Sequence, residues 1–307
     1  MTKEKRVIEV FNKIKNIIND QSFLKIIEIF NGKINFNNFA EELKYLNNFT
    51  NIWNYRNNKE RYEIDDNSID NEEKIIPLLK NLGMIDESTP KLKPDYILIL
   101  GGARNSNYNR VKYSKKIVDK YNIDNAKIVA LSTNRNINEI ENEYINEYAK
   151  GSNTEYEVIS KCLENIYKIS SLCEEVVNKD ININMMSQIK YYDEKYKNNS
   201  IISLSSPSSD IKRRANSRDT LLFFLKNFNV EKNQNVLLVT TQIYNYYQFY
   251  NLLDLAIDNN FNLECIGCSF DSNINVKLYL QELKGFINSI YKLYKKYHSI
   301  LEKNNFI

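Results

Sequence analysis

The stretch that decides the fold runs from residue 96 to residue 106 and reads Tyr-Ile-Leu-Ile-Leu-Gly-Gly-Ala-Arg-Asn-Ser. Its first five residues form an uninterrupted apolar run, which is typical of a strand buried on both faces of a parallel sheet. The glycines that follow, Gly101 and Gly102, suit either a tight turn or a close approach of the backbone to a ligand. We therefore expect this strand to end at an edge of the sheet where a ligand can bind.

Further along the chain, short apolar runs alternate with longer amphipathic stretches. The other runs are residues 128–131, 201–204, 236–239 and 263–266. The amphipathic stretches span about 108–121, 138–149, 154–171, 216–228, 244–258 and 276–302. This alternation predicts an α/β fold with an open, mostly parallel Rossmann-like sheet and helices on both faces. Residues 172–199 fit a strand, a helix or an insertion equally well.

The N-terminal part of the chain has a different pattern. Val7, Phe11, Ile14 and Ile18 lie at helical spacing, and two further short helical stretches follow. We expect residues 1–92 to form a helical N-terminal region and residues 93–307 to form the α/β domain.

Composition narrows the possible functions. No apolar run among the 307 residues approaches the roughly 18 needed to cross a bilayer, so no membrane association is expected. The start of the chain lacks the apolar block of a signal peptide and the four cysteines are scattered, which predicts a cytoplasmic protein. His298 is the single histidine, which makes zinc, haem and Ser-His-Asp chemistry unlikely. The net charge of +3 does not indicate a dedicated nucleic-acid binder.

The residues that follow the predicted strands carry the candidate site, because ligands of open parallel sheets bind beyond the carboxyl ends of the strands. Six of the nine arginines fall in these loops, and arginine matches phosphate and carboxylate geometry. The alternative is that the arginines pair with nearby acidic residues and only hold the loops together. The candidate ligand-binding residues are Gly101, Gly102, Arg104, Arg110, Arg135, Ser205, Ser206, Arg213, Arg214, Asn216, Thr220, Thr240, Thr241 and Tyr244.

Two carboxylates are candidates for acid–base catalysis. Glu155 opens a predicted helix, and Asp219 lies in the arginine-rich turn; either becomes a general base if it is desolvated. Both also suit the first turn of a helix, where they favour the helix dipole. Asn216 or Ser217 is equally suited to be the N-cap of the predicted helix over about 216–228. Tyr244 either lines the ligand pocket or packs against it.

Two apparent motifs are set aside. No G-x-G-x-x-G follows the first strand, and the second strand ends in Ser-Thr-Asn-Arg rather than in an acidic residue, so NAD(P) is unlikely. Cys265 and Cys268 form a lone C-x-x-C on a predicted strand, which favours incidental spacing over a redox or metal site.

Four short motifs, taken in order, carry a family resemblance. They are Gly101-Gly102, Thr154-Glu155, the turn 215–220 (Ala-Asn-Ser-Arg-Asp-Thr) and the strand end 236–244 (Val-Leu-Leu-Val-Thr-Thr-Gln-Ile-Tyr). Over about residues 95–260 the sequence resembles the YdcF-like (SanA/ElyC-type) domain. The resemblance implies a Rossmann-like fold and a nucleotide- or S-adenosylmethionine-like ligand. The chain departs from the family pattern at Asp219-Thr220, at Tyr244 where a histidine is common, and in lacking a membrane anchor.

Three functions are consistent with the sequence. The first is a cytoplasmic Rossmann-like enzyme that binds a phosphate- or carboxylate-bearing small molecule and transfers a group, with a nucleotide or S-adenosylmethionine as the possible cofactor and no metal. The second is a transferase that uses aminoacyl-tRNA to form amide bonds, for which the basic residues of the N-terminal helices would meet the phosphate backbone. The third is a non-catalytic ligand-binding protein.

Overall fold

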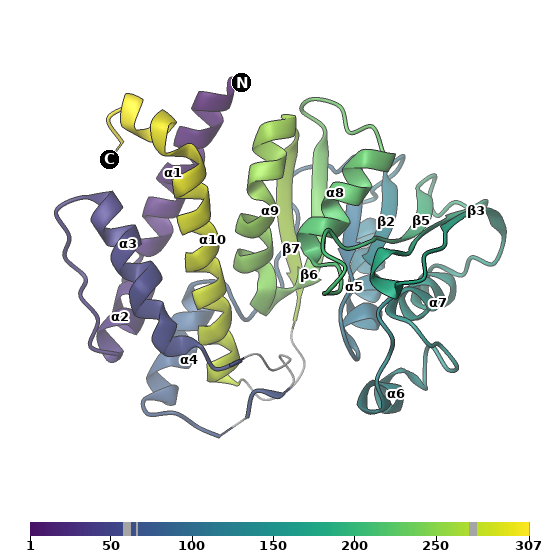
Figure 1. The fold of residues 1–307 in the computed structure, drawn as a ribbon, viewed down its shortest axis with the longest axis horizontal. Coiled ribbons are helices and arrows are strands. Elements are labelled where there is room, and N and C mark those ends of the chain that lie inside the picture. The colour runs from purple at the N-terminus through teal and green to yellow at the C-terminus, as the bar shows by residue number, and fades with distance from the viewer. Residues whose placement is uncertain (58–62, 66, 270–274, 307) are drawn as a thin grey trace. The chain divides into compact units, whose positions relative to one another are not determined.

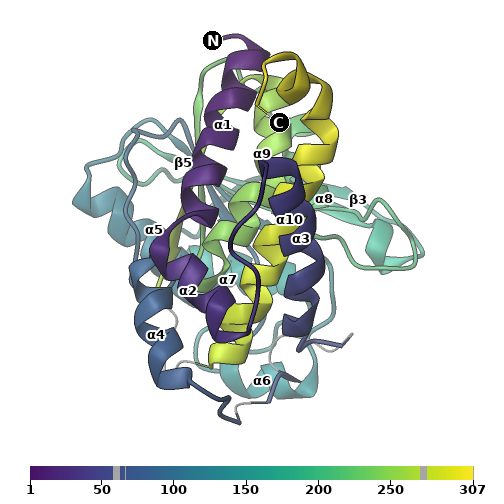
Figure 2. The same cartoon turned by 90° about the vertical axis from the view of Figure 1, so that its left-hand side faces the viewer.

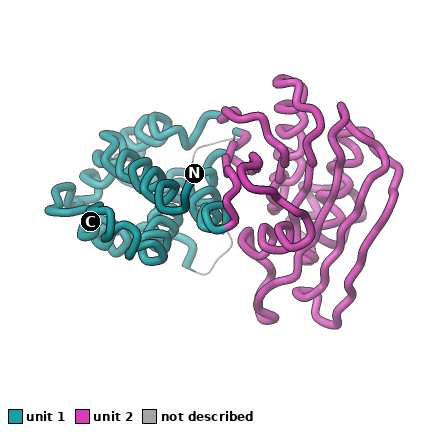
Figure 3. The backbone as a smooth tube through the Cα atoms, turned by 90° about the horizontal axis from the view of Figure 1, so that it is seen from above, with its two compact units in different colours: residues 1–87, 242–258, 269–307 teal, residues 88–241, 259–268 magenta. Residues whose placement is uncertain are grey.

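A computed structural model describes residues 1–57, 63–65, 67–269 and 275–306. The chain divides into two compact units (Figure 3). Unit 1 comprises residues 1–87, 242–258 and 269–307, and unit 2 comprises residues 88–241 and 259–268. The last two helices of the chain thus group with the N-terminal helices, so the compact units differ from a single cut along the sequence at residue 92.

Unit 1 is helical. Its helices are α1 (Lys3–Ile18), α2 (Gln21–Ile29), α3 (Phe39–Phe49), η1 (Thr50–Trp53), α4 (Glu72–Asn81), η4 (Gln242–Tyr244), α9 (Asn245–Asn259, whose last residue lies in unit 2) and α10 (Val276–Lys303). The long α10 packs against α1, α3 and α4 (Figure 2). The predicted apolar face of α1 is confirmed, since Val7, Phe11, Ile14 and Ile18 are all buried.

An ion-pair network joins α9 and α10 to α1 within this unit. The ammonium of Lys296 on α10 lies 2.6 Å from carboxylate oxygens of both Asp254 and Asp258 on α9. Lys3 of α1 reaches the other oxygen of Asp258 at 2.7 Å. These ion pairs therefore connect α1, near the start of the chain, to α9 and α10 in its last part.

Unit 2 is built on one seven-stranded mixed sheet, mostly parallel (Figure 1). Its strands are β1 (Tyr96–Leu100), β2 (Lys127–Ser132), β3 (Leu172–Asn178), β4 (Ser187–Tyr192), β5 (Ser200–Ser205), β6 (Asn235–Thr241) and β7 (Asn262–Cys268). Their order is β3-β4-β5-β2-β1-β6-β7, with β5 to β7 in that row all parallel and β4 antiparallel to both of its neighbours. The predicted α/β class and the five apolar strands are confirmed, and residues 172–199 form the β3–β4 hairpin with η3 (Ile183–Met185) between its strands.

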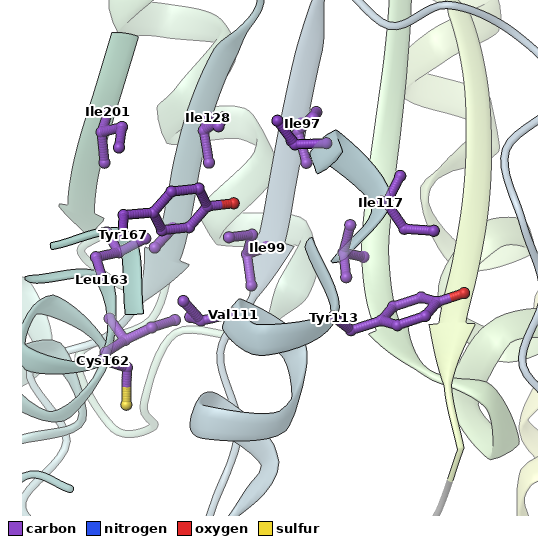
Figure 4. Packing of buried hydrophobic residues seen from close by; sticks show 14 of the residues in the cluster. Ile97, Ile99, Val111, Tyr113, Ile117, Ile128, Cys162, Leu163, Tyr167 and Ile201 are labelled. Carbon is purple, nitrogen blue, oxygen red and sulfur yellow. The ribbon is translucent and has the colours of Figure 1, made fainter. Parts of the chain in front are cut away.

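Helices cover both faces of this sheet. The helices of unit 2 are α5 (Ser106–Lys120), α6 (Glu139–Ile145), α7 (Glu155–Tyr167) and α8 (Ser217–Asn227). Side chains of α5 and α7, among them Val111 and Leu163, pack with Ile97 and Ile99 of β1 in one buried cluster (Figure 4). The neighbouring Tyr96 points to the opposite face and meets Phe224 of α8, with ring centroids 5.4 Å apart.

The sheet topology gathers the loops of interest at one edge. Residues 101–105, 133–138 and 206–216 follow β1, β2 and β5, and each leads to a helix of unit 2. Because the strands are parallel, these loops and the end of β6 share the carboxyl edge. Along the chain, β2 and β5 are added on one side of β1, whereas β6 and β7 are added on its other side. The strand order therefore reverses between β1 and β6, and this topological switch point lies beside Gly101.

Candidate ligand site at the carboxyl edge of the sheet

Gly101 lies where three segments converge. Its N–H donates to the carbonyl of Leu131 at the end of β2, 2.6 Å away. A Cβ added at Gly101 would overlap Oε1 of Glu155 and would lie 2.7 Å from that same carbonyl oxygen. The glycine therefore allows the Glu155 carboxylate to lie directly against the backbone just after β1, so that a side chain of the protein makes a close approach here; the approach of a ligand stays a prediction.

Gly102 is also sterically restricted. A Cβ there would lie 2.8 Å from Cβ of Ser106 and 3.0 Å from a guanidinium nitrogen of Arg110. The N–H of Gly102 donates to Oδ1 of Asn107 in the first turn of α5, 2.9 Å away. The turn is thus fastened to the helix that follows it.

Arg135 joins two acidic residues beside Gly101. Its guanidinium donates to both oxygens of Glu141, at 2.6 and 2.9 Å, and its Nε donates to Oε2 of Glu155 at 3.0 Å. Burial of the guanidinium favours its neutral form, but the two carboxylates outweigh this and raise the pKa of Arg135 above its ordinary value. Arg135 thus remains charged and is held in one orientation.

Glu141 has two functions in this group. It is fully buried, and it completes a capping box at the start of α6 in which Asn138 and Glu141 bond to each other's backbone N–H. Burial would raise the pKa of Glu141, but the bonds from Arg135 prevail and hold this pKa below its ordinary value. A carboxylate on the short α6 therefore fixes the arginine that orients Glu155.

Four buried polar atoms lie at the strand ends without a hydrogen-bond partner in the described part of the chain. They are Nδ2 of Asn134, Oγ of Ser205, Oγ of Ser206 and Oγ1 of Thr240. These residues are at most 3% exposed. A buried polar group without a partner costs about 1–3 kcal/mol, so such groups are uncommon and call for a physical explanation.

Three of these atoms belong to neighbouring strand ends. Ser205 pairs with Ser132 in the sheet, the N–H of Ser206 donates to the carbonyl of Ser132 at 3.0 Å, and Asn134 lies two residues beyond Ser132. Thr240 lies on β6, across the switch point. Ser152, in the turn before α7, has a further buried hydroxyl of the same kind.

Arg110 is committed to the backbone. It is 3% exposed, and one guanidinium nitrogen donates to the carbonyls of Leu100 and Gly101 at 2.7 and 2.6 Å. Its Nε donates to Oγ1 of Thr241, 3.1 Å away. Arg110 therefore ties the ends of β1 and β6 together across the switch point.

Arg104 takes the left-handed backbone conformation, with φ of 51°. Its guanidinium carbon lies 4.8 Å from the ring centroid of Tyr144, and its carbonyl accepts from the hydroxyl of Tyr148. Its side chain thus packs over the α6 region.

The residues of the arginine-rich turn form the start of α8. Asn216 and Asp219 make a capping box, and Thr220 Oγ1 donates to the carbonyl of Ser217 at 2.9 Å. Arg213 donates to Asp219 Oδ2 at 2.6 Å and to Ser209 Oγ at 2.7 Å. Burial raises the pKa of Asp219, yet the bonds from Arg213 and Asn216 prevail and hold it below the ordinary value. This geometry favours a structural over a basic role for Asp219.

Two further predicted residues are Arg214 and Tyr244. Arg214 is exposed, and Tyr244 belongs to unit 1. Residues 270–272, which the sequence places after the last strand, lie outside the described residues. Cys265 and Cys268 lie three positions apart on β7 and so point to opposite faces of the sheet, which leaves them unable to act as a pair.

Sequence reasoning missed Asn134, Glu141 and Ser209 as members of these groups. Asn138 and Glu141 have the spacing of a capping box, which is the signal that could have placed Glu141 at the start of a helix. No spacing in the sequence indicates that Glu141 would hold Arg135.

The described residues contain no group of three or more His, Cys, Asp or Glu side chains arranged to hold a metal ion. In the same part of the chain, none of the helices combines the length and hydrophobicity that a bilayer crossing requires.

Comparison with known proteins identifies a family model that covers the N-terminal helices. Residues 2–83 match the family model described as the Rv3785 N-terminal domain, which spans about a quarter of the chain and lies within unit 1. No curated protein and no solved structure matches the chain. The resemblance of residues 95–260 to the YdcF-like domain stays a prediction.

Proposed function

We propose that this chain is a Rossmann-like enzyme that binds a phosphate- or carboxylate-bearing small molecule, of nucleotide type, at the carboxyl edge of its sheet. The strand order supports the fold assignment. Counted along the chain, the parallel strands β5-β2-β1-β6-β7 have the order 3-2-1-4-5, which is that of doubly wound nucleotide-binding sheets. In such sheets the ligand lies outside the strand ends at the switch point.

The observation that carries the proposal is the set of unpartnered polar atoms on Asn134, Ser205 and Ser206, at the ends of β2 and β5. Ser205 and Ser206 are predicted site residues. A polar ligand at these strand ends would supply the missing hydrogen bonds of the three residues and so recover the free energy that their burial costs.

The anionic part of the ligand is expected to bind to neutral donors. Arg135 and Arg213 are already paired with carboxylates, and Arg110 bonds to backbone carbonyls. The hydroxyls of Ser205 and Ser206, the amide of Asn134 and the N-terminal end of α5 remain as the anion-binding groups. In this proposal the arginines hold the loops around the site in place and do not bind the ligand themselves.

Glu155 is the proposed proton-transfer group. It is buried, lies against Gly101 and carries one oxygen that Arg135 does not engage. Group transfer from or to a nucleotide or S-adenosylmethionine-like molecule is the proposed reaction class, in a cytoplasmic protein without NAD(P), haem or zinc.

The test is a thermal-shift screen with ribonucleotides, S-adenosylmethionine, phosphosugars, amino acids and bulk tRNA, followed by calorimetric titration of the compounds that raise the midpoint. A ligand that binds only the folded chain raises this midpoint by mass action. The Ser205→Ala/Ser206→Ala variant should bind the ligand roughly tenfold more weakly, since two hydrogen bonds of about 0.5–1.5 kcal/mol are lost. Ser203→Ala is the control, because Ser203 lies on the same strand but already bonds to Ser160 at 2.9 Å.

The outcomes separate the alternatives. A shift from a small anion that the double variant loses and the control retains supports the proposed site. A shift from tRNA alone favours the aminoacyl-tRNA-using transferase, although Lys3 of the N-terminal helices is already paired with Asp258. A bound ligand that is recovered chemically unchanged, with every candidate co-substrate tested, favours a non-catalytic binding protein.

A further inference from the structure

β3 forms one edge of the sheet of unit 2 (Figure 1). All seven of its residues are exposed, and three of them are large and apolar: Leu172, Val176 and Val177 are between 41% and 48% exposed. Apart from its pairing with β4, the strand makes no backbone hydrogen bond to another segment among the described residues. The outward N–H and C=O groups of such an edge strand can pair with a further strand.

The opposite edge of the same sheet is covered. The N–H of Ser88 donates to the carbonyl of Gly267 on β7 at 3.2 Å, and the N–H of Gly267 donates to Oγ of Ser88 at 3.0 Å. The carboxylate of Glu264 on β7 accepts from the N–H groups of Lys91 and Leu92. Over the part of the chain that the structure describes, the fold therefore protects one edge of its sheet and leaves the other open.

The charges along β3 restrict which strand can pair with it. Charged side chains on an edge strand normally prevent pairing with a like strand, and Glu174 and Glu175 would repel each other in many registers. Lys179, directly after the strand, supplies the opposite charge and has no ion pair with a described residue. The carboxylate of Glu175 is exposed and accepts from the hydroxyl of Tyr156 at the long distance of 3.4 Å, so it stays available to a second cation.

The spacing of these charges is self-complementary. Two identical strands that pair antiparallel are related by a twofold axis, so residues at equal distances on either side of the axis face each other. With the axis at Val177, Glu175 of each chain faces Lys179 of the partner subunit. Glu175, Val177 and Lys179 alternate along the chain and therefore share one face of the strand. An axis at Val176 loses both ion pairs, and an axis at Glu175 brings like charges together.

The structure also limits the length of this pairing. A register shift between Leu172 and Glu174 interrupts the strand on one side. On the other side, Oδ1 of Asp180 accepts from the N–H of Asn182 at 2.9 Å, which starts the turn before η3. The pairing thus spans residues 175–179 of each chain, with Val177 in the centre and an ion pair at each end.

We propose that a second copy of this chain occupies the open edge, and that two β3 strands pair antiparallel about Val177 to join two sheets into one. The pairing does not involve the proposed ligand site at the ends of β2 and β5, so either can hold without the other. Because the pairing is short, the interface should bury less than about 1,200 Å², the range of weak complexes. We therefore expect a dimer that dissociates at micromolar concentrations.

The experiment measures the oligomeric state of the full chain by sedimentation equilibrium, from low micromolar to submillimolar concentration. The wild-type chain should show a monomer–dimer equilibrium. Lys179→Glu and Glu175→Lys each place like charges opposite each other at both ends of the pairing, so each should weaken dimerisation about tenfold or more. Lys226→Glu, the same charge change at an exposed lysine of α8, is the control and should dimerise like the wild type.

Mixing the two variants tests the register itself. In a mixed dimer of Lys179→Glu with Glu175→Lys, each end of the pairing again joins one acidic and one basic side chain. The equimolar mixture should therefore dimerise within about threefold of the wild type, although each variant alone does not. A misfolded variant could not give this rescue, and far-ultraviolet circular dichroism of each variant checks the fold independently.

Rescue in the mixture, together with normal dimerisation of Lys226→Glu, supports the inference. A wild-type chain that is monomeric at every concentration overturns it, including the case in which a strand of another protein binds β3 instead. A dimer that neither variant weakens must use another surface and also overturns it. If both variants weaken the dimer but the mixture stays monomeric, Glu175 and Lys179 do not face each other, and the pairing about Val177 is wrong. Ligand binding is measured separately, so none of these results decides the proposed function.

Discussion

Arg135 and Glu155 are linked to each other in both directions. Nε of Arg135 donates to Oε2 of Glu155 at 3.0 Å, and the backbone N–H of Glu155 donates to the carbonyl of Arg135 at 2.9 Å. The end of β2 and the start of α7 are thereby held as one unit, although the two residues lie 20 positions apart. The geometry of this link depends on Glu141, which binds the other edge of the guanidinium.

Removing the charge of Glu141 should therefore destabilise the chain. Glu141→Gln leaves a mostly buried guanidinium with one carboxylate in place of two, and breaking a buried pair from one side costs about 3 kcal/mol. The free energy of unfolding in urea, followed by circular dichroism, measures this loss. Glu143→Gln on the exposed side of the same helix should change it by less than about 0.5 kcal/mol. Equal effects of the two variants would contradict the role given to Glu141.

The same carboxylate should make stability depend on pH in the acid range. Its folded pKa is held below that of the unfolded chain, which is about 4.3 for a glutamate. The contribution of Glu141 is therefore fully present above about pH 5 and is lost as the pH falls toward the folded value. The difference in unfolding free energy between wild type and Glu141→Gln should shrink steadily below about pH 4. A difference that stays constant down to pH 3 would show that Glu141 does not titrate in this way.

Ser205 and Ser203 should respond in opposite ways to the loss of a hydroxyl. Both are fully buried on β5 and point to the same face, but among the residues that the structure describes only Ser203 has a partner, Ser160. Ser203→Ala should cost about 1 kcal/mol because it also leaves Ser160 without that bond, whereas Ser205→Ala should be neutral or slightly stabilising without ligand. Urea unfolding of the ligand-free variants tests this. A loss at Ser205 as large as that at Ser203 would mean that its hydroxyl has a partner after all.

How much of this the sequence could predict depends on where each feature comes from. Strands buried on both faces appear as apolar runs, so β1 and β2 and the carboxyl edge could be predicted. β3 could not, since all seven of its residues are exposed and it pairs only with β4. The strand-end residues could be predicted as a set, because parallel strands bring their carboxyl ends together. Which partner each residue binds depends on three-dimensional packing. The pairing of Arg135 with Glu141 and Glu155 therefore could not be predicted from the spacing of these residues in the sequence.

Gly101→Ala should disturb Glu155 directly. A methyl group there meets the Glu155 carboxylate and the Leu131 carbonyl, and relieving such overlap typically costs about 1–3 kcal/mol. We expect Gly101→Ala to lower both the affinity for the ligand and the free energy of unfolding. A double-mutant cycle with Glu155→Ala measures how much of the cost comes from the side chain, because residues in contact couple by about 0.5–3 kcal/mol. Strict additivity of the two changes would show that Glu155 is not what confines Gly101.

Asp219 offers a choice between a structural and a catalytic role. Both of its oxygens accept from Arg213, at 2.6 and 3.3 Å, and Oδ2 also accepts from the N–H of Asn216 at 2.9 Å. A general base needs a free lone pair and a pKa near the working pH, whereas these bonds lower the pKa of Asp219 and occupy its oxygens.

Asn216→Ala, which removes the N-cap of α8, should lower the free energy of unfolding by about 1 kcal/mol, and Asp219→Ala should lower it by at least as much. Because the α8 start is structural in this interpretation, the Asp219→Asn variant, which keeps the shape and an acceptor oxygen, should retain most of the stability and all of the ligand affinity and turnover. A variant that folds and binds normally but loses turnover by a hundredfold or more would instead identify Asp219 as the base and remove that role from Glu155.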